Sequence, residues 1–150
     1  MAKVAVVCGS PSDQSYVDIC TEVLSQMGII FEASVISAHR HPDKIRAFAT
    51  TLKEKGFDLV IAMAGMAAHL PGVVASMTTV PVIGVPLPGS ALNGQDALYA
   101  IVQMPAGIPV ATVAIGNAGA KNAAYLAAQI IGLNDQDVRQ NYENYRTSLQ

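Results

Sequence analysis

The residues of this sequence best suited to chemistry stand together in one segment, Ser37-Ala38-His39-Arg40-His41-Pro42. A histidine can move a proton near neutral pH, and an arginine can bind a phosphate or a carboxylate through a fork of N–H donors. The alternative is that His39 and Arg40 only follow the end of a strand and lie in solvent. The elements around the segment decide between the two.

The segment follows an expected strand over residues 29–36 and precedes an expected helix over residues 42–55. Pro42 opens that helix, because proline is favoured at the first helical position, where its missing N–H would have had no partner. In open α/β sheets, ligands bind at the edge where strands end and helices begin. We therefore expect this segment at a ligand-binding edge.

Strand and helix patterns alternate along the whole chain, and this alternation predicts a parallel sheet with helices on both faces. We expect one α/β domain over residues 1–150, a three-layer αβα sandwich with a five-stranded, flavodoxin-like sheet of order 2-1-3-4-5 and an extra C-terminal helix. The other strands are expected at Lys3–Cys8, 57–63, 80–85 and 110–115, and the other helices at 16–27, 73–77, 96–103 and 119–131 and after a cap at Asn134.

In that strand order, the loops after the first three strands lie close together. Residues 9–13, with Ser10, Ser12 and Asp13, follow the first strand and suit an anion, because hydroxyls and backbone N–H groups stand at a helix N-terminus. A simpler interpretation is that Ser12 caps the helix and Asp13 complements its dipole, which leaves Ser10 unexplained.

His69 follows the third strand, within an almost uncharged segment. An isolated histidine there is more commonly a hydrogen-bonded core residue than a catalyst; the alternative is that it shares the ligand edge with His39. His39, His41 and His69 lack a ligand spacing, and no Cys or carboxylate cluster joins them, so we expect no metal site.

Charge is scarce in this chain: 13% of its residues are charged, against about 25% in a typical domain. Between Asp58 and Lys121, the sole Asp, Glu, Lys or Arg is Asp96. Prolines and glycines interrupt this region too often for a membrane helix, and no basic run favours nucleic acid. We therefore expect a sizeable homo-oligomer in which the region is buried against other subunits.

Both cysteines, Cys8 and Cys20, fall on apolar patterns and are expected to be buried packing thiols. Two cysteines do not form a disulfide framework, and the N-terminus has no signal-peptide pattern. These features predict a cytoplasmic protein.

Four motifs together resemble a known family. They are G-S-P-S-D from Gly9, S-A-H-R from Ser37, A-A-H-L-P-G from Ala67 and Q-M-P-A-G-I-P-V-A-T-V-A-I-G-N-A-G-A from Gln103. In their order and spacing, over residues 4–131, they closely resemble the bacterial, class I type of N5-carboxyaminoimidazole ribonucleotide mutase of de novo purine biosynthesis.

The resemblance implies an isomerase that converts N5-carboxyaminoimidazole ribonucleotide to 4-carboxy-5-aminoimidazole ribonucleotide without metal, cofactor or ATP. It also implies a homo-octamer with active sites at subunit contacts. By matching position, His39 would be the general acid and base, and Asp13 would bind the ribose hydroxyls. The phosphate would be held by Ser10, Ser12, Ser37 and Arg40, and the migrating carboxylate by His69 with the backbone of Ala64, Gly65 and Leu70.

Two positions depart from the family pattern. Met66 stands where a second glycine is common, which leaves the local backbone and the pocket width open. His41 stands where threonine is common before the proline, which predicts a weaker helix cap.

Two other functions compete with the mutase. One is the carboxylase branch of the same family, which joins free carbon dioxide to aminoimidazole ribonucleotide; the Q-M-P-A-G-I-P stretch favours the mutase. The other is a flavodoxin-like module that binds a phosphorylated ligand without chemistry. A binding module would tolerate His39→Asn, whereas either enzyme would lose turnover.

Overall fold

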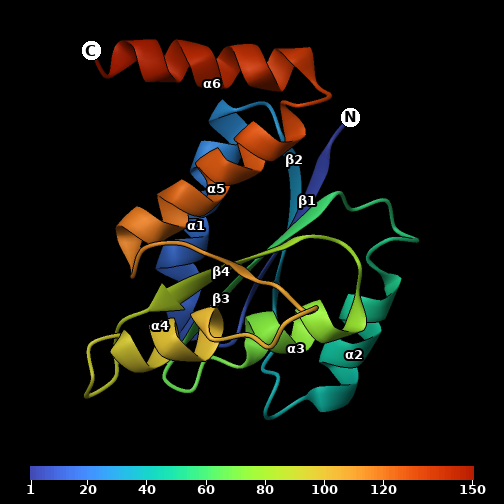
Figure 1. Cartoon of the computed structure of the whole chain (residues 1–150), viewed down its shortest axis with the longest axis vertical. Helices are drawn as coiled ribbons and strands as arrows, with labels where there is room; N and C mark the ends of the chain where they lie inside the picture. The colour runs from blue at the N-terminus through green and yellow to red at the C-terminus, as the bar shows by residue number, and fades with distance from the viewer.

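A computed structural model describes all 150 residues. It contains one parallel sheet of five strands, in the predicted order β2-β1-β3-β4-β5, with helices on both faces (Figure 1). The predicted α/β, flavodoxin-like fold is therefore confirmed. The strands are β1 (Lys3–Cys8), β2 (Ile30–Val35), β3 (Leu59–Gly65), β4 (Val82–Leu87) and β5 (Ala111–Thr112).

The helices form two layers around the sheet. On one face lie α1 (Gln14–Gln26) and α5 (Asn117–Ile131), with α6 (Gln136–Ser148) packed outside α5. On the other face lie α2 (Pro42–Thr51), α3 (Leu70–Met77) and α4 (Gln95–Val102). A short 3-10 helix, η1 (Pro11–Asp13), precedes α1. No helix is both long and apolar enough to cross a bilayer.

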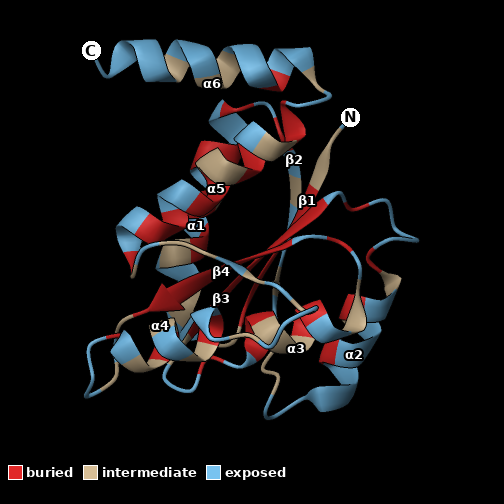
Figure 2. Cartoon of the chain, in the orientation of Figure 1, coloured by how far each residue is buried: buried red, intermediate tan, exposed pale blue.

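Strand β1 explains why the sheet needs helices on both faces. Successive side chains of a strand point to opposite faces, so an apolar run must be covered twice. Val4 and Val6 belong to the core under α1 and α5, whereas Ala5 and Val7 belong to the core with α2 and α3. Figure 2 shows the result: the central strands are buried and the outer helix faces are exposed. Cys8 and Cys20 are buried and free, as expected.

The fifth strand is shorter than predicted. We expected residues 110–115, but only Ala111 and Thr112 pair with β4. Beyond them the contacts with β4 are isolated hydrogen bonds. The N–H of Val113 donates to the carbonyl of Gly84, and the N–H of Gly116 donates to the carbonyl of Pro86. Pro86 has no N–H to donate to an edge partner, so the ladder is not continued there.

Helix ends also differ from the prediction, as α3, α2 and α6 show. Helix α3 begins at Leu70 rather than at residue 73, because proline is compatible with the first turn of a helix. Helix α2 ends at Thr51, and residues 52–56 form turns. Helix α6 is capped by Asp135 rather than by Asn134: the Asp135 carboxylate accepts the N–H groups of residues 137 and 138.

Candidate active site

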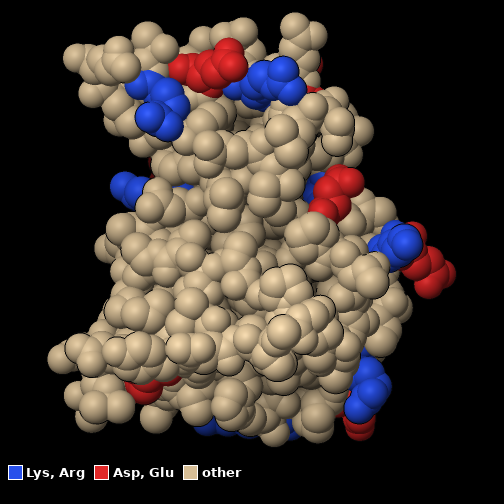
Figure 3. Space-filling model, in the orientation of Figure 1, with Lys and Arg blue, Asp and Glu red and all other residues tan.

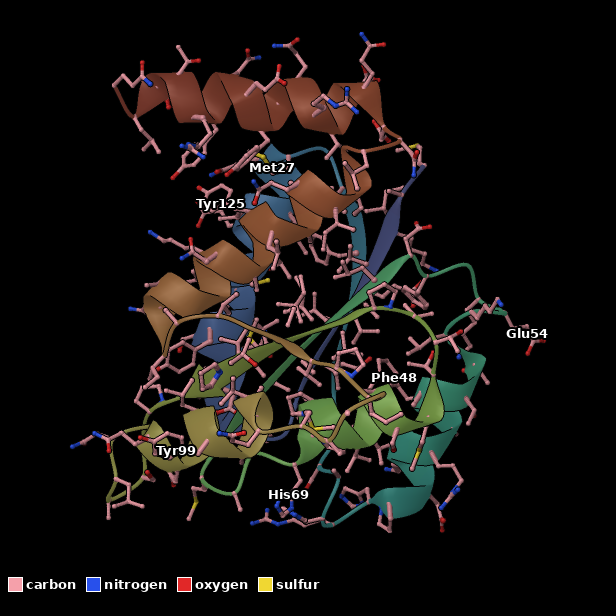
Figure 4. All side chains as sticks on the ribbon, in the orientation of Figure 1. Met27, Phe48, Glu54, His69, Tyr99 and Tyr125 are labelled. Carbon is pink, nitrogen blue, oxygen red and sulfur yellow. The ribbon has the colours of Figure 1, made fainter.

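The loops after β1, β2, β3 and β4 meet at the carboxyl edge of the sheet and enclose a cleft of about 490 Å³. In Figure 4 the labelled His69 lies at this edge, beyond the ends of the strands. All ten residues that the sequence suggests for the site line the cleft, so the polar loops do converge there. They are Ser10, Ser12, Asp13, Ser37, His39, Arg40, Ala64, Gly65, His69 and Leu70.

The loop after β1 presents two hydroxyls and a carboxylate. Ser10, not Ser12, is the capping residue: its Oγ accepts the N–H of Ser12 (3.3 Å), and the two Oγ atoms lie 2.9 Å apart. The capping interpretation offered for Ser12 is therefore wrong. Cys8 Sγ, with a pKa raised by burial, donates to the Ser10 carbonyl (3.4 Å) and ties the loop to the end of β1.

Asp13 precedes α1 without bonding to the helix through its side chain. Burial raises the pKa of this carboxyl above its ordinary value, against a smaller opposing effect of a hydrogen bond at Ser10. A helix cap would normally use the carboxylate to satisfy free N–H groups. The Asp13 carboxylate is instead a half-buried acceptor that faces the cleft.

The loop after β2 is a tight turn. Ser37 Oγ accepts the N–H of Arg40 (3.2 Å), and the Ser37 carbonyl accepts that of His41 (2.9 Å). Arg40 is exposed and forms no ion pair, so its guanidinium is available to an anion. His41 stands at the start of α2 and makes no side-chain cap bond, which confirms the weak cap predicted there.

The loop after β3 brings His69 into the cleft. Ala68 N–H donates to the Met66 carbonyl (2.9 Å), and His69 N–H donates to the Ala67 carbonyl (2.7 Å). These bonds wind the chain into the start of α3, where His69 is the capping position. Its side chain is exposed, so the interpretation of His69 as a core residue is wrong.

The two histidines meet across the cleft. His39 Nε2 lies 2.6 Å from His69 Nδ1, and the two rings pack edge to face with centroids 4.7 Å apart. The pair connects the loop after β2 to the loop after β3, across the end of β1 between them. One nitrogen must donate a hydrogen to the other at this distance, so each ring restricts the tautomer of its neighbour.

Comparison with known proteins identifies the family of this chain. The family described as AIR carboxylase matches residues 3–150. The chain belongs to the AIR carboxylase family.

Its relatives within this family carry the name that the motifs suggest. Proteins called N5-carboxyaminoimidazole ribonucleotide mutase from Escherichia coli K12 and Saccharolobus solfataricus are each 50% identical to this chain. The first match covers 97% of this chain and 86% of the relative, and the second covers 99% and 93%. The crystal structure of Treponema denticola PurE is similar at a TM-score of 0.87 and 28% identity, over 99% of this chain and 91% of that one. The resemblance is therefore confirmed.

One wall of the cleft in this member of the AIR carboxylase family, formed by the loop after β4, was not predicted from the sequence. Pro88 and Gly89, in the loop after β4, line it together with Met66 and Ala67. The predicted strand order could have revealed this wall, because it places the end of β4 beside the end of β3. No group of three or more His, Cys, Asp or Glu side chains is placed to hold a metal ion.

Proposed function

We propose that the protein is an isomerase of purine biosynthesis that converts N5-carboxyaminoimidazole ribonucleotide to 4-carboxy-5-aminoimidazole ribonucleotide. Support comes from relatives of that name, identical at half of the aligned positions over nearly the whole chain. The observation that carries the proposal is the contact between His39 and His69. It lies in a cleft with hydroxyls and an arginine on one side and an uncharged wall on the other.

The phosphate is held on the polar side of the cleft. Ser10, Ser12 and Ser37 offer hydroxyl donors, and Arg40 offers a charged fork of N–H groups. The N–H groups at the start of α1 add a partial positive charge. Next to them, the Asp13 carboxylate accepts the ribose hydroxyls, so that the nucleotide is held at two points and its ring is fixed over the histidines.

The carboxylate lies on the uncharged side. The first N–H groups of α3, including that of Leu70, have no partner within the helix and point toward its N-terminal end. With the backbone of Ala64 and Gly65, they hold the carboxylate near His69. No charged side chain lines this side, so few groups there hold water close to the released carbon dioxide.

His39 moves the proton in both halves of the reaction. It first protonates the carbamate nitrogen, the bond from that nitrogen to the carboxyl carbon breaks, and carbon dioxide and the free amine form. The ring carbon then attacks carbon dioxide, and His39 removes the proton that this carbon carries. One proton is given and one is recovered, so the enzyme returns to its starting state.

His69 positions His39 for these two transfers. A catalytic imidazole is useful only when the correct nitrogen carries the proton, and a second group usually fixes this choice. The 2.6 Å contact between the rings gives His69 this role, in addition to its contact with the carboxylate.

A labelling experiment tests the proposal. N5-carboxyaminoimidazole ribonucleotide with carbon-13 in its carboxylate is supplied in unlabelled bicarbonate buffer, and the product is examined by NMR. Label retained in the new carboxylate means direct transfer, as proposed. A product without label means exchange with the buffer and favours the carboxylase, the activity in the family's description. Absence of product would leave a binding module.

We also propose that the protein is a cytoplasmic homo-oligomer, an octamer by resemblance. Figure 3 shows a broad face over α4 and the chain between α4 and α5 that carries almost no charge. Leu92, Tyr99 and Val102 expose 46 to 62% of their surface there or beside it. Such a surface favours association. Light scattering should give a mass of several subunits, and a mass near 15.6 kDa would contradict the proposal.

A further inference from the structure

Met66 has a backbone conformation that its side chain does not favour. Its φ is +53°, and Asn93 is the only other non-glycine residue with a positive φ. Asparagine tolerates this left-handed region, because its short polar side chain can bond locally, whereas methionine gains nothing from it. A glycine at residue 66 would avoid the conflict. Something other than backbone preference therefore accounts for the methionine.

The side chain of Met66 is also unusually exposed. It is 66% accessible, although it lines the cleft. Its neighbours along that wall are small and uncharged: Ala64, Gly65 and Ala67, with Gly89 from the loop after β4. Met66 is thus the large, flexible apolar side chain at the rim of the uncharged side. An unbranched thioether chain can adapt its shape to whatever lies beneath it.

The backbone around Met66 is fixed while its side chain is not. The Met66 carbonyl accepts the N–H of Ala68, and the next carbonyl accepts that of His69. The turn that begins at Met66 therefore also delivers His69 to its contact with His39. The backbone of Met66 is therefore held on the same turn as His69, on the side of the cleft assigned to the carboxylate.

We propose that the Met66 side chain is an apolar cover that keeps released carbon dioxide in the cleft until the ring carbon attacks it. This inference rests on the proposed function. Between the breaking of the nitrogen–carbon bond and the making of the carbon–carbon bond, carbon dioxide is held by no covalent bond, so its escape competes with recapture. A small uncharged molecule is retained by apolar contact and by exclusion of water.

The test compares Met66→Ala with the unaltered protein. Both receive the carbon-13 substrate, unlabelled bicarbonate and carbonic anhydrase, which exchanges any escaped carbon dioxide with the buffer. We expect the fraction of product that keeps the label to fall about twofold or more in Met66→Ala, because the cleft no longer excludes water. Free aminoimidazole ribonucleotide should accumulate from turnovers in which no carbon dioxide is recaptured. KM should change less than about threefold, since the phosphate side is intact. Met66→Leu should retain label.

Two controls separate the possible failures. Met66→Ala keeps a Cβ at the same positive φ, so it does not relieve the backbone strain at residue 66. Asn93→Gly relieves a positive φ outside the cleft lining, so it shows what a change of backbone strain or stability alone does to label retention. Assembly mass and Tm are measured first; if Met66→Ala does not fold, Met66→Gln replaces it, since a polar chain of similar length brings water. Equal retention in the altered and unaltered proteins overturns the cover. Label lost from the unaltered protein instead overturns direct transfer itself.

Discussion

The two sides of the cleft are built on opposite principles. The loops after β1 and β2 present hydroxyls, a carboxylate and a guanidinium, and the Arg40 side chain makes no ion pair. The loops after β3 and β4 present alanine, glycine, proline and methionine, with His69 as their one ionisable side chain. The first side can bind a charged group by direct contacts, and the second can exclude water from an uncharged one. Substitutions that remove or exchange one of these properties at a time test this division.

The largest effect is expected where the two sides meet. His39→Asn keeps a polar side chain but cannot carry the proton in both transfers, so kcat should fall about 10² to 10⁴-fold. Substrate should still bind, because the phosphate side is untouched. Turnover and equilibrium binding are measured on the same preparation. His41→Asn is the control, since His41 does not line the cleft. Full turnover in His39→Asn would contradict the proton transfer proposed for His39.

The polar side is tested by removing its charge. Arg40→Met keeps the length of the side chain and loses every N–H donor, so KM should rise about 10- to 100-fold, as for lost hydrogen bonds to a charged group. The proton transfers do not involve Arg40, so kcat should change much less. Arg46→Met, an exposed arginine on α2 outside the cleft, is the matched control. An unchanged KM would place the phosphate elsewhere.

The uncharged side is tested by giving it a charge. Ala67 is exposed and lines the cleft, and Ala67→Asp places a carboxylate beside the carboxylate of the substrate. Two like charges a few ångströms apart repel by about 1 kcal/mol or more, so kcat/KM should fall about tenfold. Ala67→Asn adds similar volume without charge and should fall much less. Equal losses in the two variants would mean that size, not charge, matters on this side.

The fold was largely predictable because the signals for it are periodic. Apolar runs of five to seven residues alternate with helical patterns, and this alternation alone favours a parallel sheet. Two of the errors fell where a single residue decides the outcome. Pro86 removes one N–H from β4, and β5 shortens beside it. Asp135 and Asn134 are both good caps, and only the course of the chain selects Asp135.

The site divides in the same way as the cleft. Its polar side was found from residue types, because serines, arginine and histidine after strand ends are chemically conspicuous. The contact between His39 and His69 was not predicted, because the strand order brings their loops to one edge but the 2.6 Å distance depends on the course of each loop. Pro88 and Gly89 were not assigned, because an uncharged wall has no distinctive residue type.

The smallest effect is expected for Asp13→Asn, which should raise the thermal stability of the protein and weaken its binding of the nucleotide. Burial raises the pKa of Asp13 in the folded protein. An acid with a raised folded pKa contributes stability while it is protonated, and that contribution is lost as the pH rises through the folded value. Asp13→Asn cannot ionise, so at pH 7 it should melt about 2 °C above the unaltered protein, and the difference should vanish toward pH 4.

The same substitution should weaken binding of the nucleotide. An amide is a poorer acceptor of ribose hydroxyls than a carboxylate, so KM should rise by up to about tenfold while Tm rises. Asp18→Asn, on the exposed face of α1, is the control and should change stability by no more than about 0.5 kcal/mol. Thermal unfolding from pH 4 to 8 and steady-state kinetics measure both effects. A lower Tm of Asp13→Asn than of the unaltered protein at pH 7 would mean that the ionised Asp13 carboxylate stabilises this loop. Binding and stability would then not oppose each other at Asp13.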